Sequence, residues 1–256
     1  MPLPGILVTV ERVKTVVIIQ ARMRSTRLPG KVLKDIAGRT MLSLVVRRAQ
    51  RAKNIDGVLV ATTTGVSDQA VVEECQRLSV PVFRGPEEDV LDRYHGAAAS
   101  VGAGAIVRIT ADCPFMDPAV VDDIVAVFRK TGADYASNIL RRTFPRGLDC
   151  EVMTADALER AWREARLPHE REHVTPYLYE HPKLFHLENI EHATDLSHFR
   201  LTVDTEEDLR LVREVYERLG GREDLPWQDV AALFERDPVL ARINSSIEQK
   251  SLHGAM

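Results

Sequence analysis

Short apolar runs alternate with helical patterns through the first half of the chain, and this alternation limits the fold more than any other feature. The run Val16-Val17-Ile18-Ile19 is continuous and β-branched, which is typical of a strand buried on both faces of a parallel sheet. Comparable runs follow at 58–63, 80–83 and 105–110. Strand–helix alternation at this spacing produces βαβ units with right-handed crossovers. The sequence therefore predicts an α/β fold with a single doubly wound, mostly parallel sheet flanked by helices.

Helix signals separate these runs. Thr40 and Ser67 are predicted N-caps of helices over 40–52 and 67–78, and Pro118 suits the first turn of a further helix. Another helix is expected over 89–100.

Beyond Asp134 the regular alternation of strand and helix patterns ends. We expect strands and a turn over 135–153, two helices over 154–181, strands over 184–203, and helices over 205–219 and 227–236. This pattern predicts one domain at 14–245 with an inserted β/α lobe at about 138–200. Residues 1–13 and 246–256 are expected to be extensions, and the tail after Ser245 is expected to be disordered.

The segment between the first strand and the first helix gathers positive charge. Residues 20–31 read Gln-Ala-Arg-Met-Arg-Ser-Thr-Arg-Leu-Pro-Gly-Lys, with cations at Arg22, Arg24, Arg27 and Lys31. The Pro-Gly turn lets backbone N–H groups face a ligand. Open α/β sheets bind ligands at the carboxyl ends of their strands, where this segment begins. Because arginine and lysine suit phosphate charge, the segment predicts a polyphosphate site rather than a solvated basic loop.

Two familiar phosphate-binding loops do not fit. A P-loop would need glycine at position 25 and a hydroxyl at position 32, where the chain has Ser25 and Val32. The Gly102-Ala103-Gly104 stretch lacks a third glycine and precedes a strand instead of following one.

Ala21-Arg22 … Ser25-Thr26-Arg27-Leu28-Pro29-Gly30-Lys31 resembles the amino-terminal signature of the sugar-acid cytidylyltransferases. That family includes the synthetases of CMP-activated sialic-type acids and 3-deoxy-manno-octulosonate, and the chain is most similar to the branch named for spore-coat polysaccharide biosynthesis. In the family this loop wraps the triphosphate of CTP, on a nucleotide-binding sheet. The resemblance implies nucleotide-binding roles for Gln20, Ala21, Arg22, Ser25, Arg27, Lys31, Thr110 and Asp112. Arg24 stands where the branch has a small residue, so its role is left open.

Acidic residues follow two of the later strands. Asp112 comes directly after the run at 105–110, at the same sheet edge as the basic loop, and is predicted to coordinate Mg²⁺. Asp117, before Pro118, is instead expected to cap a helix. The resemblance favours Asp204 as the second metal ligand, although Asp204 or Thr205 can also cap the helix that follows.

Two further clusters are candidates for acceptor binding. Asp149 and Glu151 alternate along an expected strand, so both are predicted to point into one cleft, with Asp149 as a sugar or a metal contact. Arg171 and His173 are expected to contact the acidic group of the acceptor. His169 and His173 have the wrong intervening residues for a zincin.

Composition excludes several classes. A net charge of −4 argues against nucleic-acid binding, and no apolar run approaches the ~18 residues of a membrane helix. Three widely spaced cysteines fit a reducing cytoplasm and suggest neither disulfides nor zinc.

The resulting hypothesis is Mg²⁺-dependent nucleotidyl transfer. An oxygen of an acidic sugar or a phosphorylated small acid would attack the α-phosphorus of CTP, and pyrophosphate would leave. Arg22, Lys31 and Asp112 are the predicted catalytic residues. The alternative is a nucleotide-sugar-dependent glycosyltransferase, although the chain has no Asp-x-Asp motif. As in related synthetases, a homodimer through the aromatic side chains of the lobe is expected.

Overall fold

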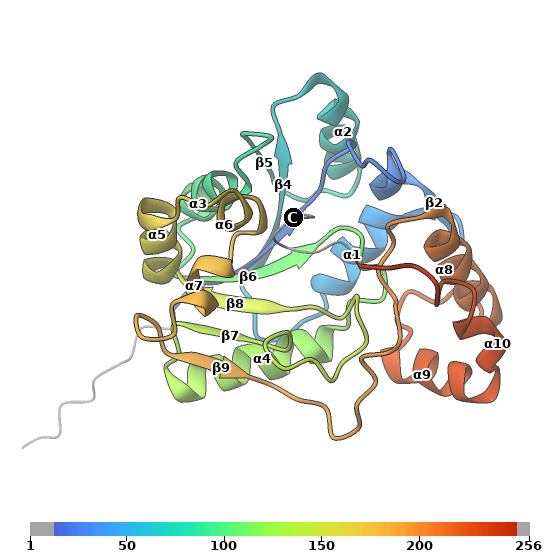
Figure 1. Cartoon of the computed structure of the whole chain (residues 1–256). Coiled ribbons are helices and arrows are strands. Elements are labelled where there is room, and N and C mark those ends of the chain that lie inside the picture. The colour runs from blue at the N-terminus through green and yellow to red at the C-terminus, as the bar shows by residue number, and fades with distance from the viewer. Residues whose placement is uncertain (1–12, 250–256) are drawn as a thin grey trace, which may run out of the picture.

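A seven-stranded sheet organises residues 13–249, the part of the chain that this computed structural model describes (Figure 1). The strand order is β5-β4-β1-β6-β8-β7-β9. The strands are β1 (Thr15–Gln20), β4 (Gly57–Thr63), β5 (Val82–Gly85), β6 (Ala105–Thr110), β7 (Tyr135–Ser137), β8 (Glu151–Thr154) and β9 (Leu187–Asn189). β5, β4, β1 and β6 are parallel, whereas β8 runs antiparallel to both β6 and β7. This mostly parallel sheet confirms the predicted α/β class.

Helices cover both faces of the sheet. They are α1 (Met41–Ala49), α2 (Gln69–Arg77), α3 (Val90–Val101), α4 (Pro118–Thr131), α5 (Ala155–Glu164), α6 (Pro168–His173), α7 (Pro176–Glu180), α8 (Glu206–Arg218), α9 (Trp227–Arg236) and α10 (Pro238–Ala241). Short 3-10 turns η1 (Lys31–Leu33) and η2 (Val66–Asp68) and the small pair β2 (Asp35–Ile36) and β3 (Arg39–Thr40) complete the regular structure of the described residues. In Figure 1, α3, α5 and α6 lie at the left and α8, α9 and α10 at the right.

The central strand β1 is buried on both faces, which explains why its residues 16–19 are all apolar. Val17 and Ile19 pack into a core with α1, α4, α8 and α9, whereas Val16 and Ile18 pack on the opposite face with α3, α5 and α7. Successive side chains of a strand point to opposite faces, so a strand covered on both sides needs apolar residues at every position.

The order of the strands creates a switch point beside β1. The chain moves outward from β1 to β4 and β5 on one side, then crosses back to place β6 on the other side. A crevice opens at the carboxyl ends of β1 and β6 in such an arrangement, and it is where open α/β sheets bind their ligands.

Several helix boundaries match the predicted signals. The Thr40 side chain accepts a hydrogen bond from Ser43 N at the start of α1, and Asp117 accepts one from Ala119 N at the start of α4. The prediction for Ser67 is wrong. Ser67 lies within η2, and α2 begins after it at Gln69.

The second half of the chain has less strand than predicted. Residues 138–150 form no helix or strand. Instead, the Asn138 side chain connects the two ends of this segment: it donates to Leu148 O (2.7 Å) and accepts from Cys150 N (3.0 Å). Over 184–203 the only strand is β9. The two helices expected over 154–181 are three, because proline occupies the first turn of both α6 and α7 and cannot continue a preceding helix.

The terminal predictions have different outcomes. The expected extension at 1–13 lies, apart from Val13, outside the described residues, as does 250–256. Residues 246–249 are described, and two arginines bind them instead of leaving them disordered: Arg27 donates to Glu248 O, and Arg200 donates to Gln249 Oε1 (2.7 Å). The limits of the domain and of the lobe stay predictions. No helix within residues 13–249 is long and apolar enough to cross a bilayer.

Candidate active site

The basic loop leaves β1 and folds back on itself before η1. Gly30 N donates to Met23 O (2.8 Å), which closes the loop, and Met23 N donates to the Asp68 carboxylate (2.6 Å), which ties it to the end of β4. Gly30 has φ 70°, a left-handed conformation that glycine adopts without strain. This turn directs Lys31 toward the carboxyl end of β6.

Three residues far apart in sequence meet at the end of that loop. Lys31 Nζ donates to Asp112 Oδ2 (2.6 Å) and to Asp204 Oδ1 (2.9 Å), and also to Val203 O (2.8 Å). Val203 N donates to Asp112 O (2.8 Å), so the backbone at 203 runs beside the end of β6. Lys31 and the two aspartates therefore lie on one side of the molecule, as the sequence predicts.

The charges of this cluster stabilise one another. Burial alone lowers the pKa of Lys31, but Asp112 and Asp204 outweigh it and raise that pKa above its ordinary value. Burial raises the pKa of Asp204, and Lys31, Arg200 and Arg27 outweigh it and lower the pKa to about 2. Lys31 is therefore cationic and Asp204 anionic throughout the neutral range.

The other cations of the loop have different partners. Arg27 forms an ion pair with Asp204 Oδ2 (3.0 Å). Arg24 pairs with Glu87 (3.1 Å) on the surface, with 71% of its side chain exposed. Arg22 makes no hydrogen bond or ion pair with residues 13–249, which leaves its guanidinium available to an anionic ligand.

A cavity of about 960 Å³ opens over the loop and the ends of β1 and β6. All eight residues predicted to bind the nucleotide line it, together with Asp204 and His173. Its size suits a nucleotide. The predicted roles of these residues stay predictions, but the structure brings all of them to one cavity.

The donor set at one end of the cavity fits a hard cation. Asp112 and Asp204 both line it, with 23% and 19% of their side chains exposed, and the Thr110 hydroxyl donates to Asp112 Oδ1 (2.6 Å). Among the described residues no group of three or more His, Cys, Asp or Glu could hold a metal by itself. Two carboxylates suit Mg²⁺, which usually takes one or two from the protein and the rest of its oxygens from phosphate and water.

Of the four predicted acceptor-binding residues, only His173 lines the cavity. Burial lowers the pKa of His173, so its imidazole is neutral at pH 7. Arg171 instead joins α6 to α3: its guanidinium donates to the Asp89 carboxylate (3.0 Å) and to Trp162 O (2.8 Å).

The prediction that Asp149 and Glu151 share one face of a strand is wrong. β8 begins only at Glu151, and Asp149 precedes it, where Arg142 binds its carboxylate through two nitrogens (2.5 and 2.8 Å). Glu151 is 2% exposed, pairs with Arg108 and accepts from the Tyr135 hydroxyl (2.7 Å). Its carboxylate already has these buried partners, and Glu151 does not line the cavity, so a role in acceptor binding stays a prediction.

Replacing Glu151 by Gln is expected to lower the free energy of unfolding by about 3 kcal/mol, because it leaves the Arg108 charge buried without its partner. Urea unfolding measures this loss. Glu159→Gln is the control, since Glu159 pairs with His95 at the surface with 46% of its side chain exposed, and it should unfold like the wild type. If Glu151→Gln has the stability of the wild type and a raised KM for the acceptor, Glu151 binds the acceptor and the buried ion pair does not explain its role.

Two further residues shape the cavity, and sequence reasoning missed one of them, Asp68. Asp68 is 2% exposed and anchors the basic loop through Met23 N, and Arg93, 1% exposed, lines the cavity beside Arg22. A carboxylate five residues beyond the end of β4 was a weak signal for Asp68. Arg93 belongs to the run 87–94, which resembles a segment that supports the nucleotide pocket in the family but also fits an ordinary amphipathic helix.

A doubly wound sheet, with a cation-lined cavity at its switch point and two carboxylates at one end of that cavity, defines a nucleotidyltransferase-like α/β enzyme. The chain belongs to the cytidylyltransferase family: the sequence model of that family, described as Cytidylyltransferase, matches residues 16–220.

Individual relatives agree. Spore coat polysaccharide biosynthesis protein SpsF of Bacillus subtilis is 35% identical over 228 residues, 86% of this chain and 94% of that protein. The structure of a cytidylyltransferase from Leptospira borgpetersenii serovar Hardjo-bovis superposes with a TM-score of 0.87 at 33% identity, covering 93% of this chain and 100% of that one. The structure of CMP:2-keto-3-deoxy-manno-octonic acid synthetase complexed with CTP shares the fold, with a TM-score of 0.63 at 21% identity over 80% of this chain and 99% of that one. The family resemblance is confirmed, and it favours nucleotidyl transfer over the glycosyltransferase alternative.

Proposed function

We propose that this enzyme transfers CMP from CTP to an acidic sugar or a phosphorylated small acid, with release of pyrophosphate, for the synthesis of a surface polysaccharide. The observation that carries the proposal is the contact of Lys31 with Asp112 and Asp204 inside a cavity lined by further cations. The spore-coat polysaccharide name of the Bacillus relative supports the choice of product class.

The basic loop would receive the triphosphate. Arg22 has no partner among the described residues, and Arg27 and Lys31 already point at the acidic end of the cavity. In phosphoryl-type transfer the protein contributes mainly position and charge, so these three cations would stabilise the negative charge that develops on the departing pyrophosphate.

Asp112 and Asp204 would hold the metal. Metal dependence is general among cytidylyltransferases, and we propose Mg²⁺ for this one because the ligands are carboxylates and phosphate oxygens. When bound, the ion would neutralise phosphate charge and orient the triphosphate. Thr110 donates to Asp112 and would fix the orientation of its carboxylate.

The acceptor would enter near His173, the one predicted acceptor residue that lines the cavity. Because its imidazole is neutral, His173 would bind a hydroxyl or carboxylate by hydrogen bonding and not as a cation. Asp149 remains a proposed sugar or metal contact, but its pairing with Arg142 means that an acceptor must compete for that carboxylate.

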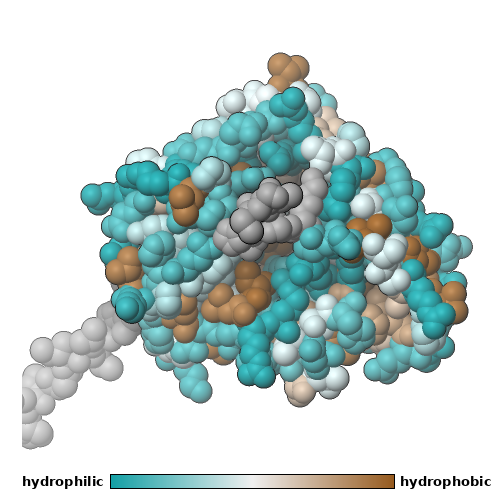
Figure 2. Space-filling view, in the orientation of Figure 1, coloured by the Kyte–Doolittle hydropathy of each residue, from teal (hydrophilic) through white to brown (hydrophobic). Residues whose placement is uncertain are grey.

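We also propose a cytoplasmic homodimer. Cys75, Cys113 and Cys150 are all free and buried, which suits a reducing compartment. Figure 2 shows a mostly hydrophilic face on which hydrophobic residues form only small groups. We propose that the dimer contact involves the lobe. A monomer at micromolar concentration in sedimentation would refute the dimer.

A screen of nucleoside triphosphates against acidic sugars and phosphorylated acids tests the proposed function. We expect pyrophosphate release to need CTP, an acidic acceptor and Mg²⁺ together, and to stop when EDTA removes the metal. Release of a nucleoside diphosphate from a nucleotide sugar would support the glycosyltransferase instead. Binding of CTP with no turnover on any acceptor would point to a non-enzymatic module.

A further inference from the structure

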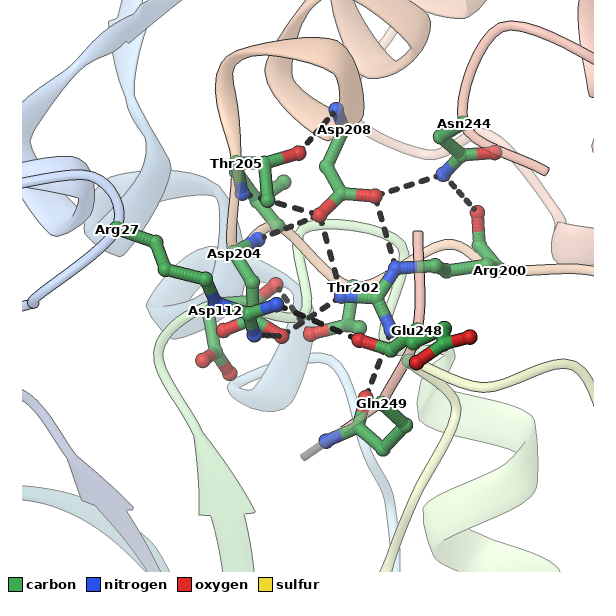
Figure 3. A network of polar contacts seen from close by, with 12 residues as sticks. Arg27, Asp112, Arg200, Thr202, Asp204, Thr205, Asp208, Asn244, Glu248 and Gln249 are labelled. Carbon is green, nitrogen blue, oxygen red and sulfur yellow. Dashed lines mark hydrogen bonds and ion pairs between the residues drawn. The ribbon is translucent and has the colours of Figure 1, made fainter. Parts of the chain in front are cut away.

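Asp204 is held by three cations, and they divide the two oxygens of its carboxylate. Oδ1 accepts from Lys31 (2.9 Å), whereas Oδ2 is bound by Arg27 (3.0 Å) and Arg200 (2.7 Å). Figure 3 shows Arg27 entering the network from the left and Arg200 from the right.

These cations differ in their access to the cavity. Arg27 and Lys31 line it, and both belong to the loop that we assign to the triphosphate. Arg200 is absent from the cavity lining, and only 9% of its side chain is exposed. A bound triphosphate can therefore draw Arg27 and Lys31 toward its oxygens, but it cannot reach Arg200.

Arg200 is fixed from behind by Asp208. Its Nε donates to Asp208 Oδ1 (2.9 Å) and one terminal nitrogen to Oδ2 (3.1 Å), and Asp208 is fully buried. Asp208 also accepts from Asp204 N (2.9 Å) and from Asn244 (2.8 Å). Since the carboxylate of Asp208 offsets the charge of Arg200, the guanidinium gives Asp204 a fixed direction more than additional charge.

Residues 244–249 complete this support. Asn244 bonds to Asp208 and to Arg200 O (3.1 Å), and Gln249 accepts from the remaining terminal nitrogen of Arg200 (2.7 Å) (Figure 3). The guanidinium thus has a partner on every side, which restricts it to one orientation.

We propose that Arg200 is a positioning residue: by binding Asp204 Oδ2 it keeps Oδ1 turned toward the cavity for the metal when the triphosphate occupies Arg27 and Lys31. This inference rests on the proposed function. Replacing a residue that hydrogen-bonds to a metal ligand typically weakens metal binding about 10- to 100-fold.

Arg200→Lys is the decisive variant, because lysine keeps the positive charge but cannot form the bidentate hydrogen bonds of a guanidinium. Mn²⁺ is titrated, as a probe for Mg²⁺, into the full-length protein with CTP and without acceptor. The enhancement of water proton relaxation separates protein-bound Mn²⁺·CTP from the free complex. We expect binding of Mn²⁺ at least about tenfold weaker than in the wild type, with CTP binding in the absence of metal unchanged.

Arg48→Lys is the matched control. Arg48 is 2% exposed and donates to the carbonyl groups of Met116 (2.6 Å) and Leu225 (2.8 Å), and it does not line the cavity. This variant should melt at a lower temperature and bind Mn²⁺ like the wild type. If R200K does not fold, Gln249→Ala is tested in its place. We expect Mn²⁺ to bind this variant about threefold more weakly than the wild type, because Arg200 loses one hydrogen bond.

Wild-type affinity in R200K, or in Gln249→Ala where that variant is the test, would overturn the positioning role and leave the proposed function intact. A wild-type protein that binds no Mn²⁺ with CTP would overturn the proposed function, and the inference with it.

Discussion

Replacing Lys31 by Ala is expected to reduce kcat/KM for CTP by at least about a hundredfold, with the fold retained. Loss of one preorganised donor at a developing charge typically costs about 3 kcal/mol. Lys31 also separates Asp112 from Asp204, which it contacts at 2.6 and 2.9 Å. Without the ammonium, the two carboxylates repel each other and the departing pyrophosphate loses a cation.

Steady-state pyrophosphate release measures this effect, and circular dichroism checks the fold. Lys34→Ala is the matched control, because Lys34 lies one short turn after Lys31 but pairs with Glu206 (3.4 Å) and does not line the cavity. Its kcat/KM should match that of the wild type. Near-normal turnover of Lys31→Ala on CTP would contradict the proposed role of the loop.

Asp112→Asn is expected to lower metal-dependent turnover about a thousandfold, equivalent to about 4 kcal/mol of transition-state stabilisation. The amide keeps the shape of the side chain: its oxygen can accept from Lys31, and its NH2 group can donate to the oxygen of the Thr110 hydroxyl. It removes the negative charge that Mg²⁺ requires, so activity falls while the melting temperature stays close to that of the wild type.

The test follows pyrophosphate release over a wide range of Mg²⁺ concentration. We expect no recovery at high Mg²⁺. Asp123→Asn, on the exposed side of α4, changes the same net charge outside the cavity and should leave the rate unchanged. An Asp112→Asn enzyme with a wild-type rate and metal dependence would remove Asp112 from the metal site.

Local patterns were sufficient wherever one segment determines its own environment. The apolar β-branched run of β1, the caps at Thr40 and Asp117, and the basic loop could all be predicted, because strand burial, helix capping and charge clustering act over a few residues. The position of Asp112 relative to Lys31 was also predictable, since parallel strands end at one edge of a sheet.

Patterns failed where a distant partner decides what a side chain does. Glu151 looks like a cleft residue in the sequence, but Arg108 on the neighbouring strand binds it inside the sheet. Arg171 is predicted to bind the acidic group of the acceptor, and in the structure it pairs with Asp89, the residue that caps α3. In both cases the competing partner lies more than 40 residues away and leaves no local signal.

The α/β class, the family and the loop that carries the cations can be read from the amino-acid order, because each depends on short-range periodicity or on a contiguous motif. Which acids reach the cavity, and which residues hold them there, became clear from the folded arrangement. Arg200, Asp208 and Asn244 converge behind Asp204 through contacts that join α8 to the end of the described chain. Hydrogen-bond geometry between separate elements exists only once the chain has folded.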